Sequence, residues 1–169
     1  MKIGVPKEIK PQESRIGLTP ESVKELVSNG HEVLVENNGG HEAGFDNSHY
    51  SSAGAKIVDK SEDIFNDSEI IVKVKEPLSN EVKMIKENQI VFTYLHLAAA
   101  KELTQGLINS KGICIAYETV TDQNGRLPLL APMSAVAGRM SVQAGAHCLE
   151  KNQKGRGLLL GGAPGVEGG

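Results

Sequence analysis

Tryptophan is absent from the sequence, and phenylalanine and tyrosine contribute only three residues each. Valine, isoleucine, leucine and alanine must therefore fill most of the core. No apolar run approaches the length that a transmembrane helix needs, and the amino terminus lacks the apolar segment of a signal peptide. Acidic and basic residues are interspersed, with a net charge of −3, which argues against nucleic acid or a membrane surface as a partner.

Cysteine is also scarce, and its two occurrences, Cys114 and Cys148, stand among apolar residues. That setting favours buried thiols in a reducing compartment over a disulfide or a redox pair. Together with the missing signal and membrane segments, it predicts a cytoplasmic protein. A chain of 169 residues is long enough for one domain with a proper core.

Short apolar runs alternate with segments of helical periodicity from the start of the chain. This alternation is typical of an α/β fold in which a parallel sheet carries helices on both faces. The expected strands are Lys2–Val5, Glu32–Glu36, Lys56–Val58, Glu69–Lys75, Ile90–Leu95 and Gly112–Tyr117, of which the last reads as buried. The expected helices start at Thr19-Pro20, after Asp46, at Ser61, at Ser79 (running to Glu87) and at Ala98 (running to Ser110).

A long helix is predicted over Pro132–Glu150, a segment rich in small residues. Apolar residues recur there at every fourth position and form a narrow packing stripe: Val136, Met140, Ala144 and Cys148. A stripe of this kind suits close contact with another helix.

The expected organisation is an α/β domain over residues 1–130, a linker helix over 131–152 and the start of a further domain over 153–169. Leu158–Leu160 reads as a strand, and Gly161–Gly165 as a linker turn, because it lacks the Gly-x-Gly-x-x-Gly pattern of a dinucleotide loop. A chain that stops on glycines soon after a linker helix is unusual for a complete protein. We therefore expect a fragment.

Polar side chains mark the ends of two neighbouring strands, Lys75 after one and His96 after the other. Ligands of open parallel sheets bind outside the carboxyl ends of the strands. Arg15 lies in the loop after the first strand, which opens at the same edge. Because arginine can grip a carboxylate through two parallel hydrogen bonds and histidine can act as an acid or base, these residues predict a site for a carboxylate ligand.

Each of these residues also has a plainer interpretation. Arg15 could be a solvated loop residue, Lys75 a surface lysine paired with Glu76, and His96 a structural histidine. The functional interpretation depends on all three arising at one edge of one sheet. The other histidines stand at no recognised metal-ligand spacing, so we assign no metal site.

Several separate motifs resemble bacterial alanine dehydrogenases, and together they cover essentially the whole chain. The motifs are Lys2-Ile3-Gly4-Val5-Pro6-Lys7-Glu8, Glu13-Ser14-Arg15-Ile16-Gly17-Leu18-Thr19-Pro20, Val72-Lys73-Val74-Lys75-Glu76-Pro77, Tyr94-Leu95-His96-Leu97-Ala98 and Leu130-Ala131-Pro132-Met133-Ser134-Ala135-Val136-Ala137-Gly138. The soluble nucleotide-binding part of proton-translocating nicotinamide nucleotide transhydrogenase shares the amino-terminal pattern. It lacks the lysine and the histidine, so Lys75 and His96 favour the amino-acid dehydrogenase.

This resemblance implies oxidative deamination of L-alanine to pyruvate and ammonia, with hydride passing to NAD. It implies that Arg15 holds the substrate carboxylate, that Lys75 binds the carboxylate or carbonyl oxygen, and that His96 is the acid/base group. Ser134 would contact the cofactor, and Glu8 would support the basic groups. The family also has a Rossmann domain with its own glycine fingerprint, and it forms hexamers when complete.

Most of that cofactor-binding domain is missing from these residues, so the chain is expected to be inactive alone. Three alternatives stay open at this point. The chain could be a stand-alone 2-oxo-acid binding module that uses Arg15 and Lys75 but not His96. It could be a fragment of a transhydrogenase nucleotide-binding subunit, or a fragment that self-associates through its exposed helix.

Overall fold

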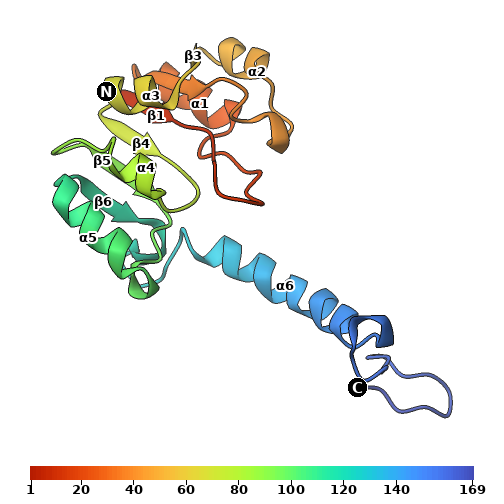
Figure 1. The fold of residues 1–169 in the computed structure, drawn as a ribbon. Helices are drawn as coiled ribbons and strands as arrows, with labels where there is room; N and C mark the ends of the chain where they lie inside the picture. The colour runs from red at the N-terminus through yellow and green to blue at the C-terminus, as the bar shows by residue number, and fades with distance from the viewer. The chain divides into compact units, whose positions relative to one another are not determined.

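The computed structural model describes all 169 residues, which form two compact units, Met1–Val120 and Thr121–Gly169. The first unit contains a six-stranded parallel sheet in the order β3-β2-β1-β4-β5-β6 (Figure 1). The strands are β1 (Lys2–Val5), β2 (Glu32–Glu36), β3 (Lys56–Val58), β4 (Ile70–Val72), β5 (Ile90–Thr93) and β6 (Ile113–Ala116). The predicted parallel α/β sheet is confirmed, and its strand order reverses between β1 and β4.

Helices cover both faces of this sheet, as predicted. The α-helices of the first unit are α1 (Pro20–Ser28), α2 (Asn47–Ser52), α3 (Ser61–Asp67), α4 (Ser79–Val82) and α5 (Lys101–Ser110), with short 3-10 turns η1 (His41–Ala43), η2 (Leu97–Ala99) and η3 (Tyr117–Thr119). Val23 of α1 and Tyr50 of α2 pack into one core cluster with strands β1 to β4. Ile64 of α3 and Leu107 of α5 belong to a second cluster, together with Ile71 and Val91.

Strands β4 and β5 are shorter than the sequence predicts. They end at Val72 and Thr93, and not at Lys75 and Leu95. Helix α4 is shorter too, since it starts at Ser79 after the N-cap residue Leu78 and ends at Val82 instead of Glu87. It ends there because the next amides, those of Met84 and Ile85, bond to carbonyls only three residues earlier, which tightens the chain into turns.

Strand β6 is the edge of the sheet, and it is not the buried strand that its apolar sequence predicts. Ile113 and Ile115 are 48% and 39% exposed. The strand register places them on the same sheet face as Ile70 and Val72. The core cluster that α1 and α2 form on this face ends at β4, so nothing in that cluster covers β6.

The second unit contains the predicted long helix, α6 (Ala131–Cys148), and the short turn η4 (Lys151–Gln153). No residue of α6 is buried, so the expected stripe is an exposed one. The expectation of buried thiols is wrong for Cys148, which is exposed, whereas Cys114 is partly buried and burial raises the pKa of its thiol. No helix in the structure is both long and apolar enough to cross a membrane.

Leu158–Leu160 forms no strand, although its leucines suggest one, because no neighbouring strand offers it a ladder. Leu159 is 64% exposed. The glycines that follow form the predicted turn, in which Ala163 and Val166 exchange backbone hydrogen bonds of 3.0 and 2.8 Å. The two units divide after Val120, and the boundary expected after residue 130 stays a prediction.

Candidate active site at the carboxyl edge of the sheet

Lys75 and His96 occupy equivalent places on two neighbouring strands. Lys75 lies three positions after Val72, where β4 ends (75 − 72 = 3), and His96 lies three positions after Thr93, where β5 ends (96 − 93 = 3). Since β4 and β5 pair in parallel, both residues emerge at the carboxyl edge of the sheet. This is the edge at which ligands of doubly wound sheets bind.

Arg15 reaches the same edge on the loop between β1 and α1. This loop lies directly against the end of β4, since a Cβ atom added at Gly17 would stand 2.6 Å from the Val72 carbonyl oxygen. Only glycine permits so close an approach of two backbones. The Tyr50 hydroxyl holds the loop from its other side by donating to the Leu18 carbonyl at 3.0 Å. Arg15 is thereby placed beside the point where the strand order reverses.

The guanidinium of Arg15 is gripped by the carboxylate of Glu13. Arg15 Nε donates to Glu13 Oε1 at 2.7 Å and Nη2 donates to Oε2 at 2.6 Å. This hydrogen-bonded pair lowers the pKa of Glu13 to about 2, with a smaller contribution from the charge of Lys75. It also raises the pKa of Arg15, to which the charge of Glu8 adds. Arg15 is thus an oriented group and not a loosely solvated one.

The Glu13–Arg15 pair predicts a specific pH dependence of stability. The pKa of Glu13 falls from 4.5 to about 2 on folding, so the pair stabilises the fold above pH 4.5 and loses this effect as the pH falls through 2. We expect Glu13→Gln to flatten the decline of the unfolding free energy between these two pH values. Urea unfolding across that range measures it, and Arg15→Met should flatten the decline likewise. Parallel slopes in the wild type and Glu13→Gln would contradict the assignment.

His96 is exposed and lies beside a group of aromatic rings. Its imidazole stacks on Tyr94, with ring centroids 5.9 Å apart and planes within 13°. Tyr94 in turn meets Tyr117 edge-on at 5.0 Å, and Tyr117 donates its hydroxyl to the Lys73 carbonyl at 2.9 Å. The backbone of His96 has φ 50° and ψ 40°, a left-handed conformation that is uncommon for residues other than glycine.

Glu76 forms an ion pair with Lys10. The simplest non-functional interpretation of Lys75 was a surface lysine paired with Glu76, and the structure gives Glu76 a different partner. Burial alone would raise the pKa of Glu76, but the Lys10 hydrogen bond and the charges of Lys10 and His96 outweigh it, and the pKa is lowered. Lys75 is left to act on groups other than the adjacent carboxylate.

A buried ion network lies directly behind the site, and sequence reasoning missed most of it. Lys73 Nζ lies 3.2 Å from Glu8 Oε2 and 2.7 Å from Glu81 Oε1. All three side chains are at most 2% exposed. The one available signal was a lysine between two valines in an apolar strand, since a lysine there needs partners. Glu8, expected to support the basic groups of the site, pairs with the buried Lys73, and its support of those groups stays a prediction.

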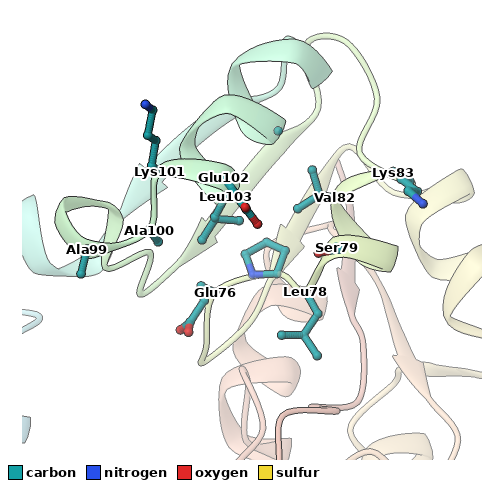
Figure 2. Close-up of a pocket in the computed structure, with 12 residues that line it drawn as sticks. Glu76, Leu78, Ser79, Val82, Lys83, Ala99, Ala100, Lys101, Glu102 and Leu103 are labelled. Carbon is teal, nitrogen blue, oxygen red and sulfur yellow. The ribbon is translucent and has the colours of Figure 1, made fainter.

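A cavity of about 600 Å³ in the first unit contains none of Arg15, Lys75 and His96. It lies between the segment after β4 and helices α4 and α5, where Val82 and Leu103 face its interior while Lys83 and Lys101 point outward (Figure 2). Its lining is mainly apolar and offers no fork of cationic groups for a carboxylate. The hollow beside Arg15, also lined by Glu8 and Glu13, is far smaller, about 10 Å³, roughly the space of one water molecule.

Ser134, the expected cofactor contact, lies in the first part of α6 and belongs to the second unit. Its amide bonds to the Leu130 carbonyl at 3.0 Å, as in an ordinary first helical turn. The structure thus brings Arg15, Lys75 and His96 to one edge of the first unit, while the role of Ser134 stays a prediction.

Comparison with known proteins identifies the family of this chain. Residues 4–137 match the family model described as "Alanine dehydrogenase/PNT, N-terminal domain". The chain is 55% identical to an alanine dehydrogenase of Halomonas elongata, over 98% of this chain and 45% of the relative. It is 50% identical to an alanine dehydrogenase of Methanococcus maripaludis, over 99% of this chain and again 45% of the relative. The chain therefore spans less than half the length of these curated relatives.

Solved structures give the same result. A structure titled L-alanine dehydrogenase matches the whole chain with a TM-score of 0.88 and 54% identity, over 46% of its own length. A transhydrogenase from Sinorhizobium meliloti matches 73% of this chain with a TM-score of 0.68 and 24% identity, which shows a shared fold only. With its parallel sheet and these similarities, the chain belongs to the alanine dehydrogenase/PNT N-terminal domain family.

Proposed function

We propose that this chain is the substrate-binding part of an NAD-dependent L-alanine dehydrogenase and binds pyruvate and L-alanine. One observation carries the proposal: a fixed guanidinium, an ammonium and an imidazole, from Arg15, Lys75 and His96, emerge at the carboxyl edge of three adjacent strands. A 2-oxo acid needs a fork for its carboxylate, a cation for its carbonyl oxygen and a group that moves protons.

Each residue has a distinct task in this proposal. Arg15, whose plane Glu13 fixes, would bind the carboxylate with little further loss of side-chain freedom. Lys75 would stabilise the negative charge that develops on the carbonyl oxygen when ammonia attacks. His96, exposed and stacked on Tyr94, would donate and accept the proton as the carbinolamine forms and collapses.

The described residues do not themselves fit a dinucleotide. Residues 158–169 form turns and one isolated bridge, with no strand that leads through a glycine-rich loop into a helix. Ser134 alone is proposed to touch NAD, which when bound would accept the hydride. We therefore assign no hydride-transfer step to this chain, and we expect it to bind substrate without turning it over.

Titration calorimetry of the chain with pyruvate tests the proposal. We expect saturable binding to the wild type and a loss of about tenfold in affinity for Arg15→Lys, which keeps the charge but loses the fork. Arg139→Lys, the same substitution at an exposed position of α6, is the matched control and should bind like the wild type. Absence of pyruvate binding, or equal affinity of Arg15→Lys and wild type, would refute the assigned role.

A further inference from the structure

The backbone amides just beyond β4 and just beyond β5 are held by carboxylates from distant parts of the chain, Glu8 after β1 and Glu118 in η3. Glu8 Oε1 accepts hydrogen bonds from the amides of Val74 at 2.6 Å and Lys75 at 3.2 Å. Glu118 Oε1 accepts from the amides of Leu95 at 3.1 Å and His96 at 2.7 Å. In both cases the second amide belongs to a residue of the candidate site. The two strand ends therefore share one arrangement.

We propose that Glu8 and Glu118 are positioning residues, of which Glu8 orients Lys75 and Glu118 orients His96 toward the substrate. This inference rests on the proposed function for what the two oriented side chains do. The orientation itself follows from contacts within the first unit.

Glu8 is suited to this task because its carboxylate is buried and is held at both oxygens. Its other oxygen, Oε2, lies 3.2 Å from Lys73 Nζ, and its side chain is 2% exposed. The peptide after Lys75 is held as well, since the buried Thr93 hydroxyl donates to the Lys75 carbonyl at 2.8 Å. With its amide and its carbonyl both bound, Lys75 has a fixed backbone, and its side chain leaves the sheet in one direction.

Glu118 holds the backbone of His96 in an uncommon conformation. The left-handed φ of 50° at His96 costs energy for a residue with a Cβ atom, and such strain persists only where surrounding contacts impose it. Burial alone would raise the pKa of Glu118, but hydrogen bonds from the amides of His96 and Leu95 outweigh it and lower the pKa. The carboxylate therefore stays ionised at neutral pH, when it accepts these bonds most strongly.

Glu81 provides a matched control for Glu8. It contacts the same lysine, with its Oε1 2.7 Å from Lys73 Nζ, and it is equally buried. It also accepts a backbone amide, that of Leu78 at 2.8 Å. Glu81 accepts none of the four amides that Glu8 and Glu118 bind. If Glu8 were important only for the stability of the network, the two glutamates would be equivalent in every assay.

The test compares Glu8→Ala, Glu8→Gln, Glu81→Ala and Glu118→Ala in the full chain, at a temperature where circular dichroism shows each variant folded. The pyruvate affinity should fall at least about tenfold in Glu8→Ala, stay within about twofold in Glu81→Ala, and be partly restored in Glu8→Gln, which keeps one acceptor oxygen. Equal losses in the two alanine variants would overturn the role of Glu8.

Amide proton resonances of the same variants give a readout that needs no ligand. Glu8→Ala should move the Val74 and Lys75 amides upfield and leave those of Leu95 and His96 in place, and Glu118→Ala should do the reverse and abolish the contact between the Tyr94 and His96 rings. Glu81→Ala should move neither pair. Unmoved Lys75 or His96 amides would overturn the proposal even if pyruvate binds. If the wild type binds no pyruvate, the proposed function fails, and these resonances alone decide the positioning.

Discussion

Lys73→Met is expected to lower the unfolding free energy of the first unit by about 3–5 kcal/mol, the usual cost of leaving buried charges without their partner. The methionine would fill much of the space of the lysine, but Glu8 and Glu81 would face one another as two carboxylates that water cannot reach. A loss of this size is a large fraction of the roughly 5–15 kcal/mol that keeps a domain folded. Urea unfolding at neutral pH measures it.

Two further variants isolate the cause of that loss. Lys83→Met makes the same substitution at an exposed lysine just after α4 and should change stability by no more than about 0.5 kcal/mol. Combining Lys73→Met with Glu8→Gln and Glu81→Gln removes every charge of the network and should recover most of the lost stability, because no unpaired ion is left buried. If Lys73→Met were as stable as Lys83→Met, the charges of Glu8, Lys73 and Glu81 would not be buried as described above.

His96→Ala is expected to have the largest effect on catalysis. The assay uses a chimera in which this chain replaces the matching residues of the Halomonas elongata alanine dehydrogenase. Loss of a general acid/base group should lower the kcat for NADH-dependent reductive amination of pyruvate by about 10²–10⁴-fold. Pyruvate binding to the 169-residue chain should change far less, since Arg15 and Lys75 remain. Consumption of NADH follows the reaction.

His31→Ala serves as the control, because His31 directly precedes β2, at the amino-terminal end of that strand, and its imidazole lies 3.4 Å from the chain's amino group. It should leave kcat as it is in the parent chimera. A His96→Ala chimera that keeps a tenth or more of the parent rate would exclude His96 as the acid/base group. A parent chimera without activity, formed from a chain that binds pyruvate through Arg15, would favour the stand-alone binding module instead.

Local sequence patterns were sufficient for the sheet and for placing three candidate residues at its carboxyl edge, because strand alternation and strand ends are local properties. Lys75 and His96 were predictable since polar residues after apolar runs mark the carboxyl edge of a parallel sheet. The strand ends themselves were placed too late. The amides of Val74 and Lys75 leave the ladder to bind Glu8, which lies more than 60 residues earlier in the chain, and no local pattern shows such a partner.

The supporting residues were hidden for the same reason. Glu81 and Glu118 resemble ordinary surface carboxylates in the sequence, and only the folded chain reveals that one meets a buried lysine and the other meets two amides. The exposure of Ile113 and Ile115 was equally unpredictable, because a hydrophobic strand reads alike at the centre and at the edge of a sheet. A hydrophobic pattern indicates which residues tend to be buried, but it does not indicate which helix or strand of the fold will cover them.

The pairing of Glu13 with Arg15 has a consequence for how an anionic ligand approaches. Both residues belong to one loop, and the carboxylate of Glu13 neutralises the positive charge of the Arg15 guanidinium. Lys73 is likewise outnumbered by the two carboxylates around it. The site therefore does not attract anions from a distance by a strong positive field, and association should depend little on ionic strength. Recognition would take place at contact, where a carboxylate meets a guanidinium whose plane Glu13 already fixes.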